Sequence, residues 1–293
     1  MKTILVHAPG EDELVLEREV EDSYREQITR ARNIVIKAGS DVLVGQEGEL
    51  NLDVMANLIK QMAEYVKKGY RITFVTSGSV AAGKAGREGD DAKDIDERVL
   101  SAEGQPRLMG NYDQLCRNYL GRNAAQAILE ESHFQEKRKA HTKNFFDAVY
   151  KDGGLVIVNA NDPMWTGELK ELGKGSDNDQ MAFWMYGLLK ADLAIYLSTV
   201  DGFIHNMGEK DERKIDLVVG ITRKTRAMVK EINSTHGSYG MESKLKRIDQ
   251  IMDKKGQAII ANGKLPDVVS RILSGEEVGT YFARKKEVGK YLT

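Results

Sequence analysis

From residue 31 onward, short apolar runs alternate with stretches in which apolar residues recur at helical spacing. The mostly apolar run 33–36 leads into a glycine turn, residues 52–66 have helical periodicity, and 70–75 is expected to be the next strand. The same alternation continues through the apolar runs 154–158 and 193–197. Strands joined by helices of this length form a mostly parallel sheet that helices cover on both faces. The sequence therefore predicts an α/β protein.

Composition and charge exclude several classes of protein. The 43 Lys and Arg residues nearly balance the 45 Asp and Glu residues, whereas a general nucleic-acid binder needs a basic surface. No apolar run reaches the ~18 residues of a membrane span, and the N-terminus lacks the pattern of a secretory signal. The five histidines form no i, i+4 pair, which argues against zinc. The single cysteine, Cys116, is expected to be a structural or surface thiol, and the chain is expected to be cytoplasmic.

Some segments have weaker patterns. Residues 1–30 are acidic and are expected to contribute one strand and one helix, as an extension that packs on the main domain or caps a subunit contact. Residues 41–45 are expected to start a hairpin, and 88–98 to form a charged loop. A helix is expected over 108–120.

Polar side chains stand where four of the predicted strands end. Lys37, Ser77, Asp162 and Ser198 each follow an apolar run directly or within a few residues. In parallel sheets, ligands bind beyond the carboxyl ends of the strands. The sequence therefore predicts a site at this edge.

Two acid-amide clusters are the most informative of these polar segments. Asn159-Ala160-Asn161-Asp162 follows a buried strand, and Asp177-Asn178-Asp179 opens an apolar helical stretch. Asp and Asn can hold an ammonium group, a polar substrate or a metal, but they also cap helices. One residue suffices for a cap, so three in a row favour a binding role.

Three further segments could bind anions. Lys37 is followed by Gly39 and Ser40, whose backbone amides could meet phosphate oxygens beside the lysine charge, although a lysine at a strand end is more often a surface residue. The segment Ser77-Gly78-Ser79 opens a helix, where free amides bind carboxylate or phosphate or simply form a cap. The flexible turn that starts at Gly237 opens a helix expected over 241–252, with Lys244 one turn in; it could wrap phosphates, or could be a plain surface loop.

The order and spacing of these segments resemble the amino acid kinase superfamily, and within it the glutamate 5-kinase family. The resemblance covers residues 31–283 and rests on the stretches 35–40, 75–83, 104–109, 159–162, 177–179, 197–202, 240–244 and 261–263. It implies a three-layer αβα sandwich with a mostly parallel central sheet, in which glutamate and ATP lie end to end at the carboxyl edge. It also implies one kinase domain over 31–293, preceded by the 1–30 extension and without the C-terminal RNA-binding-type domain of many bacterial members.

The resemblance also implies roles for single residues. Lys37 and Lys244 would stabilise the transferred phosphoryl group, and Asp179 would hold the two lysines. The substrate-binding residues would be Ser77, Gly78, Asp162, Asp177 and Asn178. The ATP-binding residues would be Lys37, Gly39, Ser40, Ser198, Thr199, Ser238, Tyr239, Gly240, Met241 and Lys244.

The chemistry of a carboxylate acceptor agrees with these residue types. A side-chain carboxylate is already ionised at pH 7, so it needs no general base to attack a γ-phosphate. Catalysis then reduces to positioning and to neutralising charge, with Mg²⁺ carried by ATP rather than by a cluster of protein ligands. The implied reaction converts L-glutamate to L-glutamyl 5-phosphate, the first step of proline biosynthesis. The labile acyl phosphate implies a partner that consumes it, for example a glutamyl-phosphate reductase, and the resemblance implies a homodimer or tetramer.

Two departures from the family pattern keep alternatives open. Ala160 stands where the family usually has Glu, and Tyr239 where it usually has Gly. A related kinase with another acceptor is one alternative, and a non-catalytic protein that binds ATP and an amino acid is the other. A panel of acceptors in an assay of ADP release distinguishes them.

Overall fold

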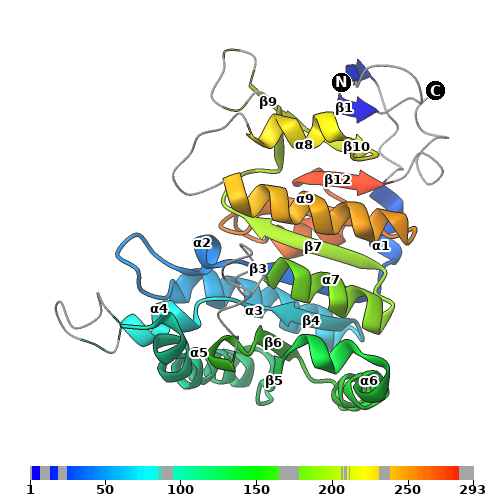
Figure 1. Ribbon diagram of the computed structural model, residues 1–293. Helices are drawn as coiled ribbons and strands as arrows, with labels where there is room; N and C mark the ends of the chain where they lie inside the picture. Colours follow the sequence, from blue (N-terminus) through cyan, green and yellow to red (C-terminus); the bar gives the residue numbers. More distant parts are fainter. Residues whose placement is uncertain are drawn as a thin grey trace. The chain divides into compact units, whose positions relative to one another are not determined.

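The computed structural model describes residues 2–6, 14–18, 25–85, 87, 95–164, 178–205, 207, 210, 212–230 and 238–283 (Figure 1). The chain divides into two compact units. Unit 1 comprises Met1–Ala31 together with Asp192–Thr293, and unit 2 comprises Arg32–Ala191.

Unit 2 contains a parallel sheet of four strands. Their order is β3-β4-β6-β5, and each neighbouring pair runs parallel. Strands β3 (Asn33–Ala38), β4 (Arg71–Val75) and β6 (Val156–Ala160) are almost entirely buried, whereas β5 (Ala125–Leu129) alternates buried with exposed residues. Continuous apolar runs are typical of strands that are covered on both faces. The prediction of an α/β fold with a mostly parallel sheet is confirmed for this unit.

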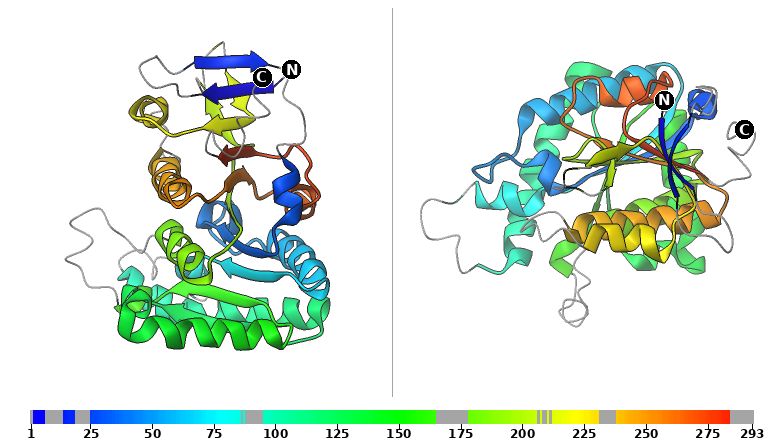
Figure 2. Two further views of the ribbon diagram at one scale, coloured as in Figure 1. Left: turned by 90° about the vertical axis from the view of Figure 1, so that its right-hand side faces the viewer. Right: turned by 90° about the horizontal axis from the view of Figure 1, so that it is seen from above.

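Helices cover both faces of this sheet. Figure 2 shows α3 (Leu52–Lys67) and α7 (Asn178–Leu189) on opposite sides of β3 and β4. Helix α3 begins at an N-cap, where the Asn51 side chain accepts a hydrogen bond from the backbone N–H of Val54. The other α-helices in the part of unit 2 that the structure describes are α2 (Ser40–Leu43), α4 (Ser79–Lys84), α5 (Glu97–Leu120) and α6 (Glu136–Lys151).

Two sequence predictions in unit 2 are wrong. Helix α5 starts at Glu97, not near residue 108, so residues 97 and 98 belong to a helix and not to a loop. Pro106 lies inside this helix on its exposed side, where water can satisfy the carbonyl that loses its N–H partner. Residues 40–43 form a helical turn and not the first strand of a hairpin, and antiparallel pairing there is limited to Val44 and Leu50.

Unit 1 contains a mixed sheet. Its strand order is β2-β1-β10-β12-β11-β7, in which β2 and β1 are antiparallel, as are β12 and β11, while the other pairs are parallel. The bounds are β1 (Lys2–Val6), β2 (Leu14–Arg18), β7 (Leu193–Ser198), β10 (Leu217–Val219), β11 (Ala258–Asn262) and β12 (Thr280–Ala283). A separate two-stranded sheet is formed by β8 (Phe203–His205), which pairs antiparallel with β9 (Arg213–Ile215).

Among the described residues of unit 1, four helices accompany this sheet. In Figure 2, α9 (Ser238–Asp253) and α10 (Val268–Leu273) lie on opposite sides of β11 and β12. The other two are α1 (Glu26–Arg30) and α8 (Arg223–Lys230). No helix in the described part of the chain combines the length and apolar character needed to cross a membrane.

The N-terminal segment contributes to the sheet of unit 1. It holds two strands and a helix where the sequence predicted one strand and one helix. Ile4 and Leu5 of β1 are fully buried. Arg25 is also buried, and its guanidinium donates hydrogen bonds to the carbonyl oxygens of Glu276, Val278 and Gly279. These contacts tie the start of the chain to the loop before β12.

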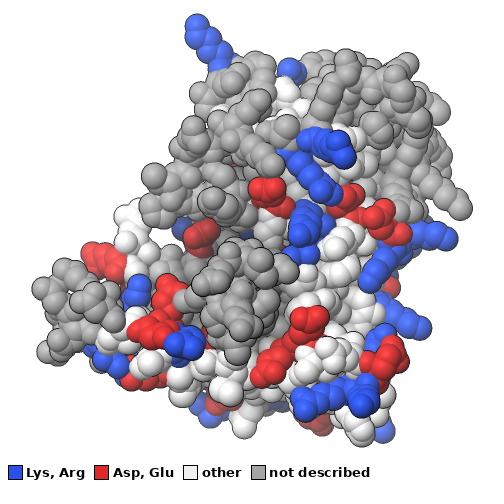
Figure 3. All heavy atoms as spheres, in the orientation of Figure 1, with Lys and Arg blue, Asp and Glu red and all other residues white. Residues whose placement is uncertain are grey.

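Charges of both signs are interspersed on the described part of one face of the molecule (Figure 3). On the face shown in Figure 3, Lys and Arg side chains stand in small groups between Asp and Glu side chains. This distribution agrees with the formal net charge of −2.

Candidate active site

In unit 2, the carboxyl ends of β3, β4 and β6 bring together most of the residues predicted to bind the acceptor. Lys37 lies in β3, and Ser77 follows β4. Asp162 begins the 3₁₀ turn η4 (Asp162–Met164) just after β6, and Asn178 and Asp179 open α7. Asp177 lies outside the described residues.

A buried ion pair joins β3 to α7. Lys37 Nζ lies 2.6 Å from Asp179 Oδ1, and the two side chains are 8% and 4% exposed. Gly39 leaves room for the ammonium group, because a Cβ at that position would lie 3.0 Å from Nζ. Removing either partner of such a pair would leave an uncompensated buried charge.

An amide network lies beside this ion pair. Asn178 Nδ2 donates to Ser77 Oγ over 2.9 Å and to Asn159 Oδ1 over 3.4 Å. Asn159 Nδ2 in turn donates to Gln105 Oε1 of α5 over 2.8 Å. Its own Oδ1 also accepts from the backbone N–H of Ala160 over 2.9 Å.

Two buried serines hold the carboxylate of Asp162. The Oγ atoms of Ser79 and Ser101 each lie 3.3 Å from Asp162 Oδ2, and Ser101 Oγ lies 2.9 Å from Ser79 Oγ. Ser79 and Ser101 are 2% and 1% exposed. Hydrogen bonds of this kind stabilise the ionised form of a carboxylate.

Sequence reasoning did not assign site roles to Gln105, Asn159 or Ser101. Gln105 belongs to the stretch 104–109 and Asn159 to the first acid-amide cluster, so both lay within segments that the sequence singled out. Ser101 gave no signal of its own.

Gly39, Ser40 and Gly78, which were predicted to contact phosphate or substrate, lie at the starts of two short helices. Gly78 precedes α4 with φ of +106°, a left-handed conformation that favours glycine. Gly39 precedes α2, and Ser40 is the exposed first residue of that helix. Their backbone amides therefore stand at the same edge as Lys37 and Ser77.

Unit 1 holds the residues predicted to bind ATP from later in the chain. Ser198 ends β7, and Thr199 follows it as an exposed residue. The Ser198 carbonyl accepts from the backbone N–H of Gly263, and Asn262 Nδ2 donates to Asp201 Oδ1 over 2.9 Å. The loops after β7 and β11 are thereby joined.

Lys244 lies on a helix, as its place in the helix expected over 241–252 implies. Helix α9 starts at Ser238 and not at Met241, so the expectation of a flexible turn is wrong for residues 238–240. Lys244 Nζ is buried and donates to the Gly240 carbonyl over 3.1 Å, while Met241 is half-buried. The side chains of Ser238 and Tyr239 lie outside what the structure describes.

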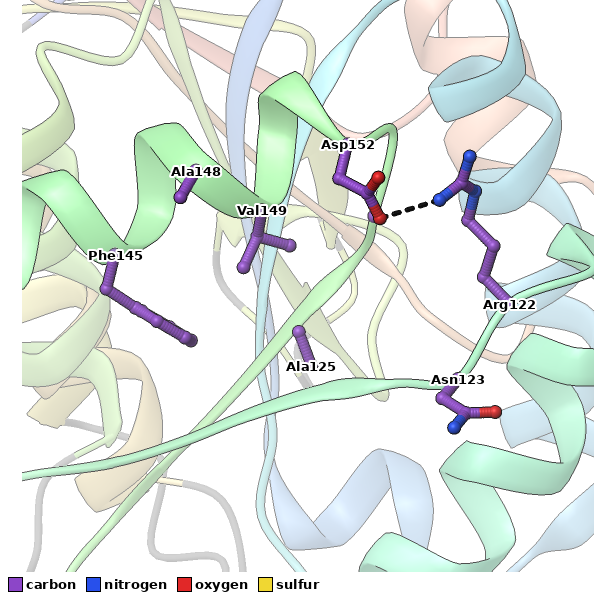
Figure 4. Close-up of a pocket in the computed structure, with 8 residues that line it drawn as sticks. Arg122, Asn123, Ala125, Phe145, Ala148, Val149 and Asp152 are labelled. Carbon is purple, nitrogen blue, oxygen red and sulfur yellow. Dashed lines mark hydrogen bonds and ion pairs between the residues drawn. The ribbon is translucent and has the colours of Figure 1, made fainter.

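A cavity of about 530 Å³ lies elsewhere in unit 2 (Figure 4). Arg122, Asn123, Phe145, Val149 and Asp152 are among its lining residues, and an exposed Arg122–Asp152 ion pair of 2.6 Å crosses its rim. The cavity lies at the amino ends of β5 and β6. It is therefore at the edge opposite the carboxyl ends of the strands, where Lys37 and Ser77 lie.

Cys116 is a structural thiol. It is fully buried in α5, and burial, with a smaller contribution from Asp113, raises the pKa of its thiol to about 12. A thiol with this pKa stays protonated at neutral pH, so it is not a nucleophile.

Comparisons with known proteins identify the family of this chain. The model of the amino acid kinase family matches residues 32–262. The chain is similar to a glutamate 5-kinase of Desulfotalea psychrophila, with 31% identity over 90% of this chain and 70% of that protein. It is also 30% identical to a glutamate 5-kinase of Listeria monocytogenes, over 90% of this chain and 97% of the relative.

Among solved structures, a carbamate kinase from Giardia lamblia bound to AMP-PNP has a similar fold. The TM-score is 0.61 at 15% identity, and the match covers 87% of this chain and 99% of that one. Since the family model spans most of the chain and the relatives match along most of their length, the chain belongs to the amino acid kinase family.

Proposed function

We propose that this protein is a glutamate 5-kinase, which transfers the γ-phosphoryl group of ATP to the side-chain carboxylate of L-glutamate. The observation that carries the proposal is the buried Lys37–Asp179 pair beside the Ser77–Asn178 hydrogen bond, at the carboxyl edge of a parallel sheet. The curated relatives named glutamate 5-kinase support the choice of acceptor.

The residues at this edge have the chemistry that binding an amino acid requires. Asp162 supplies a negative charge for an α-ammonium group, and Asn178 and Ser77 supply an amide and a hydroxyl. Lys37 supplies positive charge for the phosphoryl group as negative charge spreads over its oxygens. The reacting carboxylate is already ionised, so the bond to phosphorus forms as the bond to ADP breaks, and no proton has to be removed from the acceptor.

The nucleotide is assigned to residues of unit 1. Ser198, Thr199, Gly240 and Lys244 are proposed to contact ATP, with Lys244 supplying positive charge to its phosphates. The described part of the chain holds no group of three His, Cys, Asp or Glu side chains that could cage a metal. Mg²⁺ commonly binds through nucleotide phosphates and water, so it would be carried by ATP.

The product has consequences for the partner and the location. An acyl phosphate hydrolyses readily, so a reductase that accepts L-glutamyl 5-phosphate is the proposed partner. A cytoplasmic location accords with one buried thiol and no disulfide.

An acceptor panel tests the proposal. Purified protein with Mg-ATP is supplied in turn with L-glutamate, L-aspartate, N-acetyl-L-glutamate and carbamate, and ADP release is followed in a coupled assay. Release that depends on L-glutamate and exceeds release with each other acceptor supports the proposal. Preference for another acceptor would overturn the substrate assignment, and release with none would overturn the kinase activity.

A further inference from the structure

We propose that Gln105 and Ser101, one helical turn apart on α5, are positioning residues. They orient the side chains of the acceptor site that bind the α-ammonium and α-carboxylate groups of an amino acid. The inference rests on the proposed function and deepens it. Residues four apart lie on the same face of a helix. Gln105 contacts the amide network, and Ser101 contacts the carboxylate of Asp162.

The orientation of the amide network follows from one backbone group. The N–H of Ala160 can only donate, so the Asn159 atom that it meets at 2.9 Å must be the oxygen. Asn159 Nδ2 therefore faces Gln105, which accepts with Oε1 at 2.8 Å. Without that acceptor, the Asn159 amide would have a buried donor with no partner there, and flipping would set its NH₂ against the Ala160 N–H.

The same constraint passes on to Asn178. The atom of Asn178 that meets Asn159 Oδ1 must be the donor Nδ2, so its Oδ1 is left as an acceptor. This oxygen is buried, and none of the described residues donates a hydrogen bond to it. Asn178 itself is 8% exposed. An unmatched buried acceptor is costly unless a ligand supplies a donor, and an α-ammonium group is such a donor.

Ser77 is left as a hydrogen-bond donor, whereas Asn178 is left as an acceptor. Its oxygen accepts from Asn178 Nδ2, so the hydroxyl hydrogen is the group that it can offer to a ligand. The hydrogen suits a carboxylate oxygen. Asn178 thus accepts a hydrogen bond from the α-ammonium group of the substrate, and Ser77 donates one to its α-carboxylate.

Ser101 helps to hold the carboxylate of Asp162 in place. Its hydroxyl and that of Ser79 meet the same oxygen of Asp162, and the three side chains come from α5, α4 and η4. The contact requires α4 and α5 to touch. A Cβ at Gly104 would lie 1.8 Å from the Ser79 carbonyl oxygen, and one at Gly83 would lie 2.0 Å from that of Leu100. The two glycines therefore allow Ser101 to reach its partners.

The test compares Ser101→Ala and three glutamine variants with the wild type. Gln105→Met removes the acceptor at nearly constant size, and Gln105→Glu keeps an acceptor oxygen. Gln114→Met makes the first of these changes at an exposed position of the same helix. KM and kcat are measured with L-glutamate and with glutarate, which lacks the α-ammonium, and KM is measured with ATP.

We expect Gln105→Met to raise KM for L-glutamate about tenfold or more, because a hydrogen bond to a charged group is lost or misdirected. KM for glutarate should change by less than about threefold, and KM for ATP should not change. Gln105→Glu should stay within about threefold of the wild type for L-glutamate, and Gln114→Met should match the wild type. A smaller increase in the same direction is expected for Ser101→Ala.

An equal rise in KM for L-glutamate and glutarate would overturn the inference, as would equal effects of Gln105→Met and Gln105→Glu. If Gln105→Met does not fold, Ser101→Ala still decides by the same ratio of KM values. If the wild type prefers another amino acid, the substrate assignment fails, but the inference is tested with that amino acid and its des-amino analogue. Use of no amino acid would overturn both.

Discussion

At the scale of single residues, the acceptor site depends on buried polar groups that are matched to one another. Lys37 and Asp179 are nearly inaccessible to solvent and lie 2.6 Å apart. Buried charges are tolerated only when they are paired and hydrogen-bonded, so this pair constrains both β3 and α7. Loss of the pair is therefore expected to lower both the stability of the fold and the rate of turnover.

Asp179→Asn should lower both stability and turnover. The Lys37 ammonium would lose its countercharge, which should reduce the free energy of unfolding by about 3 kcal/mol and kcat by at least about tenfold. Denaturant unfolding and the assay of ADP release measure the two effects. The double variant Lys37→Met with Asp179→Leu should recover most of the stability and none of the activity. Wild-type stability and kcat in Asp179→Asn would contradict the role of the pair.

Cys116 should be silent towards thiol reagents in the native protein. Its pKa of about 12 leaves only about one thiol in ten thousand ionised at pH 8, and the side chain is buried. In denaturant the pKa returns to about 8.5, and the thiol should react fully. A chromogenic disulfide reagent measures both rates. Rapid native labelling at pH 8, with activity intact, would show that the thiol is accessible.

At the scale of elements, the contact between α4 and α5 positions the serines of the site. Both helices carry a glycine where they cross, and neither position has room for a Cβ beside the backbone of the other helix. Close approach of backbones is a use for which glycine is suited, at the cost of lower helix propensity. A small side chain added at this crossing should therefore push the two helices apart and displace Ser79 and Ser101 from Asp162.

Gly104→Ala should destabilise the protein by about 3 kcal/mol, because its methyl group overlaps the backbone of α4. Gly110→Ala is the matched control on the same helix. Gly110 is exposed and a Cβ there meets nothing within 4 Å, so the change should be neutral or stabilise by up to about 1 kcal/mol. Thermal unfolding of both variants gives the comparison. Equal melting temperatures would mean that the helices do not cross this closely.

At the scale of the whole molecule, hydrophobic periodicity predicted the alternation of strands and helices, because burial on both faces of a sheet imposes it on the sequence. The strand ends then placed Lys37, Ser77 and Asp162 at one edge. The starts of α5 and α9 could not be predicted. Pro106 and Gly240 weaken the local helical pattern, whereas the structure carries both inside helices. Local propensity is a weak guide where tertiary packing decides.

The roles of Ser101 and Gln105 could not be predicted from the sequence for a different reason. Ser101 reaches Asp162 only because α4 and α5 touch, and Gln105 acts through Asn159 on Asn178. Each of these relations joins segments far apart in the chain. No spacing in the sequence reports such contacts, although Gln105 stood in a stretch that the family resemblance had marked.

The measurement that tests the central claim most directly is the trapping of the product. The purified protein is incubated with Mg-ATP, L-glutamate and hydroxylamine, which converts an acyl phosphate to a hydroxamate. We expect γ-glutamyl hydroxamate that depends on both ATP and L-glutamate, and we expect it to form at least about tenfold more slowly in Asp179→Asn. No hydroxamate from folded protein that retains ATP binding would contradict the assignment of the side-chain carboxylate of L-glutamate as the phosphoryl acceptor.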